Sequence, residues 1–396
     1  MKESLKRLKW HCKGKKWVKD MLTAFSVKNF KFHKETQLEL GNLTLLTGVN
    51  SAGKTSLIQA LLLLRQSWLT DRLMQGLDLN GPLCKIGTAQ DALYRQADRG
   101  ILDIKIDAEE SFLFSYDAET ALNSSFLPPK EYSETATREK LEKCSLFNQN
   151  FQYVSSLRLG GKSHFPQFNF EVDQHQISQI LGQGECVAHF LYKFGTESTF
   201  NYLFDDKEYL LSSQVEQWER RISEGITINV QKNMNEGFDI HYGYVRDGEK
   251  NIMDLKAENI GYGISHSLPI VVALLAAKPN DLVILENPEA HLHPKGQAEL
   301  AKLISRIAQH GVQLIVETHS DHILNGIQLA AKNFEEGKQT GLDRSKIKIY
   351  YVTPEPTTQT YAVAQKVTIE SNGLLDKQPQ GFFDQAEMDL IDLNGF

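Results

Sequence analysis

A glycine-rich segment, Gly48-Val-Asn-Ser-Ala-Gly-Lys-Thr-Ser56, places the strongest constraint on what this chain can fold into. It matches the pattern G-x-x-x-x-G-K-[ST] at every fixed position. An apolar β-type stretch at 43–47 precedes it, and an apolar helical stretch at 57–64 follows it. The segment therefore predicts a loop between a buried strand and a buried helix, with backbone N–H groups and a helix N-terminus that bind phosphate.

The residue types in this loop indicate a nucleoside triphosphate bound together with Mg²⁺. Gly48 and Gly53 allow the backbone to approach phosphate oxygens closely. Lys54 is expected to reach the β- and γ-phosphates, and the Thr55 hydroxyl is expected to bind Mg²⁺. The other loop positions expected to contact the nucleotide are Asn50, Ser51, Ala52 and Ser56.

The bulk composition is that of an ordinary globular protein with room for two or three domain-sized cores in 396 residues. No apolar run reaches the roughly 18 residues of a membrane span. The 4 cysteines are far apart and form no CxxC pair, which argues against a zinc cage or a disulfide framework. We therefore expect a cytoplasmic protein without a membrane partner.

Charge is distributed unevenly along the chain. Residues 1–20 carry a net charge of +6, so the rest of the chain carries −13 within the total of −7. This leader lacks the apolar core of a signal peptide. It is either a basic arm for nucleic acid or another anionic surface, or an artefact of a gene start that really lies at Met21.

The strand and helix patterns divide the chain into four ranges. Alternating apolar residues predict strands at 22–30, 37–40, 102–106, 168–172 and 226–230, and residues 118–145 are polar enough for a mobile loop. From residue 259 onward strands and helices alternate, which predicts a parallel α/β sheet with the nucleotide at the carboxyl ends of its strands. The expected domains are a leader at 1–20, an N-terminal ATPase lobe at 21–100, an inserted α+β segment at 101–255 and a C-terminal lobe at 256–396.

Three later segments resemble the ABC-type ATPases, particularly their SMC, RecF and OLD branches. Leu282-Val-Ile-Leu-Glu-Asn-Pro-Glu289 resembles their Walker B segment, and Glu317-Thr-His-Ser320 resembles their switch-histidine motif. Asn259-Ile-Gly-Tyr-Gly-Ile-Ser265 lies where those families carry the signature loop. The resemblance implies a P-loop NTPase fold of the ABC-ATPase type.

The same resemblance implies roles for individual residues. Glu286 would position Mg²⁺ together with Thr55, and His319 would sense the γ-phosphate. Asn287 stands where the catalytic glutamate is expected. The signature positions would contact the γ-phosphate bound by a partner subunit, and they are Gly261, Gly263 and Ser265.

A narrower resemblance is to one bacterial family of standalone AAA-type ATPases with an uncharacterised C-terminal segment, grouped with OLD-like and anti-phage defence ATPases. It covers about 21–100 and 255–390. Residues 153–158 and 182–185 are landmarks of this family without an assigned role. The other segments that carry the resemblance are 27–31, the GYGIS, ENPEAHLHP and ETHSDHILNGI sequences, and the terminal GFFDQ box at 381–385.

Asn287 affects the expected turnover. An amide can orient a water molecule but cannot accept its proton. Hydrolysis is therefore expected to be slow, with a long-lived ATP-bound state, or to use Glu289 or Glu317 as the base.

Two other interpretations of the site stay open. A zinc cluster of His291, His293, His319 and His322 is the alternative to a dimer-facing turn after Walker B. Gln90 or Asp91 is a candidate for the Q-loop element of the ABC-type enzymes.

The signature loop acts on the partner's nucleotide, so the resemblance implies a homodimer or higher oligomer that sandwiches ATP. The leading hypothesis is a switch in phage defence or DNA maintenance, with nucleic acid and a separate nuclease or other effector as partners. Only 77 residues follow His319, without a convincing Glu…Asp-x-Asp set, so we expect any nuclease on another chain. The alternative is a nucleotide-gated scaffold protein that does not touch nucleic acid, which the acidic body favours. A transporter subunit is disfavoured, because the LSGGQ and Asp-Glu elements are both altered.

Overall fold

The computed structural model describes residues 20–199, 209–234, 236–244, 255–377, 389 and 391–393. Its centre is a six-stranded sheet in the order β17-β16-β3-β15-β14-β9. Neighbouring strands are parallel from β9 to β16, and β17 is antiparallel to β16. The strand bounds are β3 Leu43–Gly48, β9 Phe151–Val154, β14 Leu282–Glu286, β15 Gln313–Glu317, β16 Ile347–Pro354 and β17 Ala362–Val367. The predicted parallel core sheet is confirmed.

The two faces of this sheet belong to two different hydrophobic cores. Successive side chains of a strand point to opposite faces, so Leu45 lies in one core and Leu46 in the other. Leu285 and Ile284 of β14 divide in the same way. Both faces are apolar because helices cover both, as parallel sheets require.

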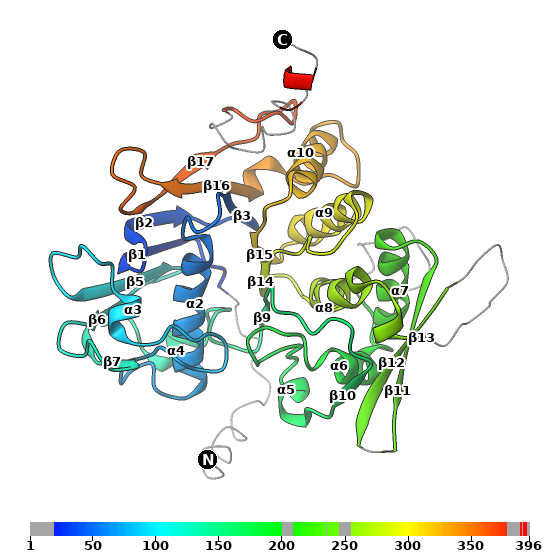
Figure 1. Cartoon of the computed structure of the whole chain (residues 1–396), viewed down its shortest axis with the longest axis horizontal. Coiled ribbons are helices and arrows are strands. Elements are labelled where there is room, and N and C mark those ends of the chain that lie inside the picture. Colours follow the sequence, from blue (N-terminus) through cyan, green and yellow to red (C-terminus); the bar gives the residue numbers. More distant parts are fainter. Residues whose placement is uncertain are drawn as a thin grey trace.

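One long helix covers one face and three cover the other. Helix α2, Lys54–Leu69, packs in the core that contains Leu46. Helices α8, Tyr262–Ala276, α9, Pro294–Gln309, and α10, Asp321–Glu335, pack in the core that contains Leu45. Figure 1 shows α2 to the left of the central strands and α8, α9 and α10 to their right.

A five-stranded antiparallel sheet joins α2 in the left half of Figure 1, in the order β2-β1-β5-β6-β8. Its β1–β2 hairpin lies before the P-loop in sequence. A two-stranded sheet, β4 with β7, and two short helices complete this half. The bounds are β1 Ala24–Phe30, β2 His33–Glu39, β4 Leu77–Asp78, α3 Ala89–Ala92, β5 Ile101–Asp107, β6 Ser111–Asp117, β7 Phe126–Leu127, β8 Pro129–Tyr132 and α4 Arg138–Leu141.

The other half adds a small antiparallel sheet in the order β10-β12-β11, with β13 paired to β12. Helices α6 and α7 lie between this sheet and α8. The bounds are β10 His164–Pro166, α5 Asn169–Asp173, α6 Val187–Phe194, α7 Leu211–Ile222, β11 Ile226–Lys232, β12 Gly237–Tyr244, β13 Leu255–Lys256, η3 Ala257–Asn259 and η4 Arg344–Lys346.

The structure corrects three local expectations. The strand expected at 168–172 is helix α5, because partly buried Phe168 and buried Val172 face the core at helical i, i+4 spacing while Phe170 is exposed. Residues 118–145 contain β7, β8 and α4, and Leu127 and Leu141 in this range are fully buried. The range 101–255 is not one separate insertion, because β5, β6 and β8 extend the N-terminal sheet and β9 forms an edge of the central sheet.

Two sequence features lie outside the described residues: positions 1–19 of the basic leader and the GFFDQ box at 381–385. Among the residues that the structure does describe, no helix has the length and apolar character needed to cross a membrane.

Candidate nucleotide site

The P-loop follows β3 and bends sharply before α2 begins at Lys54. Gly48 and Gly53 have φ values of 136° and 100°, and Ser51 has a φ of 62°. A Cβ on Gly48 would lie 2.0 Å from the carbonyl oxygen of Val352 on the neighbouring strand. The backbone conformation therefore requires glycine at both positions.

Lys54 is buried inside this loop. Its ammonium group donates to the carbonyl oxygens of Gly48 at 3.0 Å and Val49 at 2.8 Å. Burial lowers the pKa of Lys54, and the nearby Glu317 carboxylate opposes that shift. The ammonium group thus lies within the phosphate-binding loop itself.

His33 supports the P-loop from behind, and sequence reasoning missed it. The fully buried imidazole lies between Gly53 and Thr36: Nε2 is 2.9 Å from the Gly53 carbonyl oxygen, and Nδ1 is 2.9 Å from the Thr36 hydroxyl. Burial lowers the pKa of His33 to about 4, so the ring is neutral. Nε2–H then donates to Gly53 and Nδ1 accepts from Thr36. A lone histidine in a strand gives no sequence signal for this role.

Glu286 and Glu317 are the last residues of the neighbouring parallel strands β14 and β15, and they are directly paired in the sheet. Glu317 Oε1 accepts from the Thr55 hydroxyl at 2.8 Å. Glu286 accepts from the Tyr153 hydroxyl at 3.0 Å and from the Ser156 N–H at 3.3 Å. Thr55 thus contacts the acid of β15, the strand between β3 and the Walker B strand β14, and Glu317 joins Thr55 and Glu286 as a residue near the expected Mg²⁺ position.

Three acids gather at this edge of the sheet. Burial raises the pKa of Glu286, Glu289 and Glu317, the last to about 7 with further contributions from the two other acids. One oxygen of Glu289, one of Glu317 and the amide oxygen of Asn287 are buried without a hydrogen-bond partner. Unpaired buried oxygens of this kind fit a divalent cation.

The donor set also suits Mg²⁺ in particular. No group of three or more His, Cys, Asp or Glu among the described residues has the arrangement of a complete metal cage. Mg²⁺ in phosphate-binding sites takes only one or two ligands from the protein and the rest from phosphates and water. Thr55 with Glu286 or Glu317 would hold such an ion, which would neutralise phosphate charge.

Asn287 follows Walker B in a left-handed conformation with a φ of 43°. Its N–H donates to the carbonyl oxygen of Glu317 at 2.8 Å, which ties the two strand ends together. Asparagine tolerates this conformation better than most residues. The backbone thus gives a physical reason for asparagine at a position where the resemblance led us to expect glutamate.

Glu289 and His319 are also brought together. Glu289 Oε1 accepts from the backbone N–H of His319 at 2.8 Å. The His319 side chain is exposed beside the P-loop, and its pKa is lowered by partial burial and by Lys54. The predicted catalytic positions therefore meet at the carboxyl edge of the sheet.

The signature-like segment begins helix α8. Gly263 passes so close to the turn after Walker B that a Cβ there would lie 2.5 Å from the carbonyl oxygen of His291, whereas Gly261 faces open space. Ser265 is buried, and its hydroxyl accepts from Gly161 N–H at 2.8 Å and donates to Tyr262 O at 3.1 Å. The hydroxyl expected to face a partner's phosphate is therefore turned into its own chain.

Glu219 anchors α8 from α7. It is fully buried and accepts from the Ser267 hydroxyl at 2.7 Å, and its other oxygen has no partner. Burial raises the pKa of Glu219 to about 8. This carboxyl is protonated at neutral pH.

Two side chains considered for a zinc cluster or a Q-loop element cap helices instead. His293 precedes α9 and its Nδ1 accepts from the N–H of Lys295 at 3.4 Å. Asp91 accepts from the N–H and hydroxyl of Thr88, both at 2.8 Å, in a capping box. Neither contact involves the P-loop, so the histidine cluster and the Asp91 Q-loop element gain no support among the described residues.

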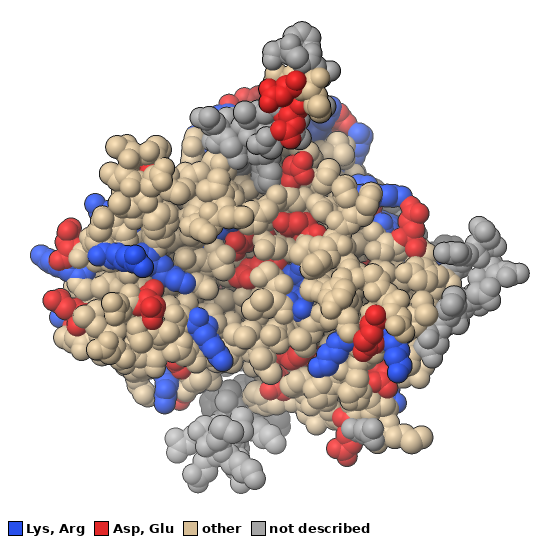
Figure 2. Space-filling model, viewed as in Figure 1, with Lys and Arg blue, Asp and Glu red and all other residues tan. Residues whose placement is uncertain are grey.

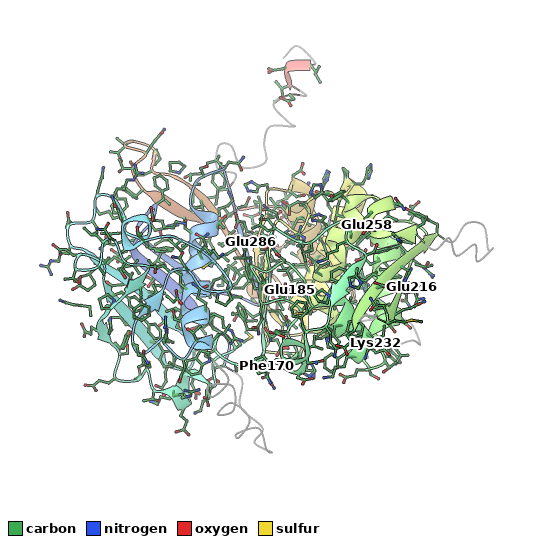
Figure 3. All side chains as sticks on the ribbon, turned by 60° about the horizontal axis from the view of Figure 1, so that its bottom comes forward. Phe170, Glu185, Glu216, Lys232, Glu258 and Glu286 are labelled. Carbon is green, nitrogen blue, oxygen red and sulfur yellow. The ribbon has the colours of Figure 1, made fainter. Side chains whose placement is uncertain are left out.

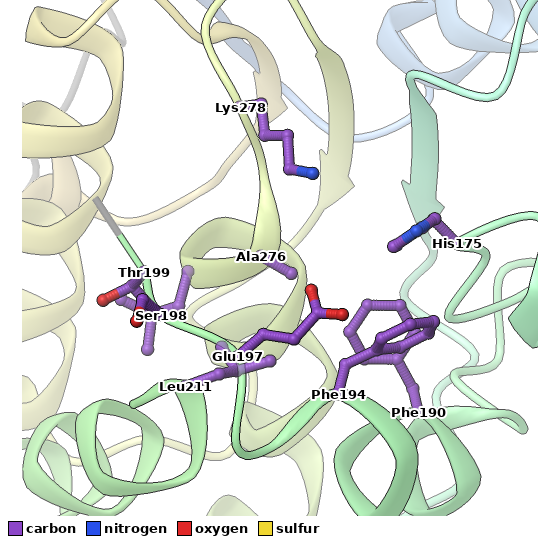
Figure 4. Close-up of a pocket in the computed structure, with 10 residues that line it drawn as sticks. His175, Phe190, Phe194, Glu197, Ser198, Thr199, Leu211, Ala276 and Lys278 are labelled. Carbon is purple, nitrogen blue, oxygen red and sulfur yellow. The ribbon is translucent and has the colours of Figure 1, made fainter. Parts of the chain in front are cut away.

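A separate pocket of about 370 Å³ lies among α6, α7 and α8. Figure 4 shows His175 over the ring of Phe194, with Glu197 and Lys278 nearby. The two rings stack with centroids 4.4 Å apart. No P-loop or strand-end residue lines this pocket, so it is distinct from the nucleotide site.

Strand order, P-loop and acidic strand ends together define the fold of a P-loop NTPase of the ABC-ATPase type. Models of known families agree: an AAA ATPase domain matches residues 21–182. An AAA domain described as a putative AbiEii toxin of a type IV TA system matches residues 186–325. A protein family of unknown function (DUF3696) matches residues 342–393. The chain is thus an ATPase with AAA-type domains.

The chain is also similar to individual known proteins. The OLD nuclease of Thermus scotoductus is 24% identical over 330 residues, which are 76% of this chain and 59% of that protein. The chain therefore spans about three fifths of the length of this curated relative. An Smc head bound to the C-winged helix domain of ScpA has a TM-score of 0.54 at 13% identity, over 88% of this chain and 98% of that one.

A second solved structure gives the same result. The Smc head domain with an extended coiled coil, bound to the C-terminal domain of ScpA derived from Pyrococcus furiosus, has a TM-score of 0.54 at 12% identity, over 95% of this chain and 100% of that one. At such identities the likeness concerns the fold alone.

Proposed function

We propose that this protein is an ATP-binding switch in which two copies pair head to tail around ATP with Mg²⁺. The paired state would act in phage defence or DNA maintenance through a separate effector, such as a nuclease, in the cytoplasm. The relative named OLD nuclease and the AbiEii-type family description support this setting.

One observation carries the pairing. The P-loop leads into α2 on one face of the central sheet, whereas Gly261 and Tyr262 begin α8, which packs on the other face. Helix α8 packs on α6, α7, α9, β9 and β14, and α2 packs on β1, β3 and β4. A site that needs both a P-loop and the start of α8 is therefore built from two copies.

Exposed apolar side chains around the site support the same arrangement. Tyr262 is 60% exposed at the start of α8, Leu157 is 63% exposed after β9, and Val49 is 42% exposed in the P-loop. Exposed apolar side chains that a partner could cover are typical of interaction sites when they lie near each other. A second copy would bury them together with the nucleotide.

Slow hydrolysis would make this pairing long-lived. The amide of Asn287 cannot take a proton from water, and Glu289 and Glu317 each have one oxygen committed to His319 N–H and to Thr55. Purified protein is expected to turn over ATP far below the ~10 s⁻¹ of a median enzyme. A partner-free rate at that level would refute the slow-switch proposal.

Molecular mass in solution tests the pairing directly. We expect light scattering to give a monomer without nucleotide or with ADP, and a dimer with ATP. A Lys54→Ala variant is the matched control and should stay monomeric with ATP. The same mass under all conditions would exclude an ATP-dependent dimer.

The alternative is a nucleotide-gated scaffold protein that controls a protein effector without touching nucleic acid. In Figure 2, Lys and Arg side chains are scattered among uncharged residues and form no continuous band on that face. The net charge of −13 beyond residue 20 points the same way, because DNA binding relies on basic residues at the phosphates.

Duplex DNA binding separates the two proposals. We expect affinity to rise with ATP and to fall steeply as salt increases if the switch acts on DNA. Binding that does not respond to ATP at low salt would exclude the nucleic-acid version and leave the scaffold.

A further inference from the structure

The segment 153–161, which had no assigned role, contacts Walker B directly. Tyr153 O–H and Ser156 N–H donate to the two carboxylate oxygens of Glu286. The segment leaves β9, whose neighbour in the sheet is β14. Both oxygens of the Walker B acid are thus held by one stretch of chain.

Arg158 holds the backbone carbonyls of that acid and of the residue after it. It is only 5% exposed, and its Nη1 donates to Ser155 O at 2.6 Å and to Glu286 O at 2.8 Å. Its Nη2 donates to Asn287 O at 2.9 Å. Burial lowers the pKa of Arg158 to about 10, so it stays charged at neutral pH. A planar fork holds two successive carbonyls in a way that a lysine cannot.

The same segment continues onto the first turn of α8. Gly161 N–H donates to the Ser265 hydroxyl at 2.8 Å. A Cβ on Gly160 would lie 2.0 Å from the His266 ring, and one on Gly161 would lie 3.3 Å from the Tyr262 ring. The loop therefore lies against the start of α8 with no space between them.

A second loop, 182–185, supports this segment from the other side. Ser155 N–H donates to Gly182 O at 2.8 Å, and Leu159 N–H donates to Gln183 O at 3.0 Å. A Cβ on Gly184 would lie 2.7 Å from Pro269 in α8. Figure 3 labels Glu185 of this loop and Glu286 in the middle of the molecule, where the two halves meet. Both unassigned landmarks thus lie between Walker B and α8.

We propose that Arg158 is a positioning residue that couples the Walker B turn to the start of α8, through segment 153–161 and its bond to Ser265. When ATP changes the position of the Glu286–Asn287 backbone, Arg158 moves with it, and the first turn of α8 follows. The inference builds on the proposed ATP switch, because that switch needs the start of α8 to respond to nucleotide bound in the same chain.

An Arg158→Lys variant tests this coupling. It keeps the positive charge but cannot hold both carbonyls. We expect the Kd for a fluorescent ATP analogue to stay within about 3-fold of wild type, which is ~0.7 kcal/mol or less. We expect the ATP-induced change in hydrogen exchange at the amides of 261–265 to fall about 10-fold. Arg344→Lys, at an exposed ion pair with Glu335, is the matched control.

Two outcomes would overturn the proposal. One is a wild-type ATP response at 261–265 in Arg158→Lys. The other is an equal loss of ATP affinity and of that response, which would make Arg158 only a structural support. Because dimer formation could itself protect the amides of 261–265, exchange is measured at a protein concentration at which light scattering gives a monomer with ATP. A wild-type protein that responds at 261–265 there but stays monomeric at every concentration would refute the proposed pairing and leave the coupling intact.

Ser265→Ala provides a second measurement at the far end of the connection and covers the case in which Arg158→Lys does not fold. It removes the acceptor of Gly161 N–H. We expect it to reduce the exchange response at 261–265 about 5-fold, and to add little in the double variant, because both residues act in one connection. Additive effects, or an unchanged response in Ser265→Ala, would contradict the proposal.

Discussion

The P-loop and the start of α8 are each supported by a buried titratable side chain, but the two supports respond to pH in opposite directions. His33 behind the P-loop is neutral and both ring nitrogens have partners. Glu219 behind α8 has one oxygen without a partner. Burial lowers the pKa of the first to about 4 and raises that of the second to about 8.

The linkage between proton binding and folding gives the sign of each effect. Between pH 4 and 6.5 the unfolded state binds a proton at His33 that the folded state excludes, so this group makes stability rise with pH. Between pH 4.5 and about 8 the folded state keeps a proton on Glu219 that the unfolded state loses, so this group makes stability fall as pH rises. His33 behind the P-loop therefore contributes most to stability near neutral pH, whereas Glu219 behind α8 contributes most at acidic pH.

The largest expected effect is on the P-loop half. Lys54→Ala removes the ammonium group that lies inside the loop, and we expect ATP affinity and hydrolysis to fall by about 10²–10³, as for other lost donors to developing charge. Fluorescent ATP binding and phosphate release measure this. The melting temperature without nucleotide should change little. Retained ATP affinity would mean that the loop does not bind the triphosphate through Lys54.

Glu219→Gln tests the support of α8. In the wild type, Glu219 should make the free energy of unfolding fall by about 1.4 kcal/mol per pH unit as pH rises from 4.5 toward about 8. The variant should lack this contribution. Urea unfolding across this range measures it. Glu216→Gln on the same helix, a partly exposed partner of Arg220, is the control and should keep the wild-type slope. Equal slopes in wild type and Glu219→Gln would show that this carboxyl does not titrate with folding.

His33→Gln tests the opposite sign. Because the amide does not titrate, the variant should lose the rise in stability between pH 4 and 6.5. The weakened support of Gly53 should also raise the Kd for ATP by about 10-fold, which corresponds to about 1.4 kcal/mol. The same unfolding and binding assays apply. An unchanged affinity would separate the pH effect from loop geometry.

The smallest effect on a single chain is expected for Tyr262→Ala. Its side chain is mostly exposed, so stability and ATP affinity of the monomer should stay near wild type, as for most surface changes. The ATP-dependent dimer should weaken by about 10-fold or more, as for an interface aromatic. Tyr192→Ala, at another exposed tyrosine, is the control for light scattering. Equal dimer affinity in both variants would place the interface elsewhere.

The motif residues and the residues that support them differ in how well the sequence predicted them. The P-loop, the parallel sheet and the acids at its strand ends followed from local motifs, because one stretch of chain carries each of them. The supports were not predictable in this way. His33 lies 20 residues before Gly53, Ser267 lies 48 residues after Glu219, and Arg158 lies 128 residues before Glu286.

Two contacts within the site were not predictable for the same reason. Ser265 was expected to face a partner, but its hydroxyl accepts a hydrogen bond from the N–H of Gly161, 104 residues earlier. Thr55 and Glu286 were expected to share Mg²⁺, and the strand order adds Glu317, which lies between Walker B and the P-loop and contacts Thr55. Motifs indicated which residues belong to the site, whereas only the pairing of distant segments decides which of them touch.

The internal hydrogen bonds of Lys54 and Thr55 make nucleotide binding an exchange reaction. The ammonium group already bonds to two carbonyl oxygens of its own loop, and the Thr55 hydroxyl bonds to Glu317. A triphosphate must replace these bonds, so its affinity reflects only the difference between the old and new partners. A small fragment such as free phosphate gains little from that replacement, and the site favours ligands large enough to form many contacts at once.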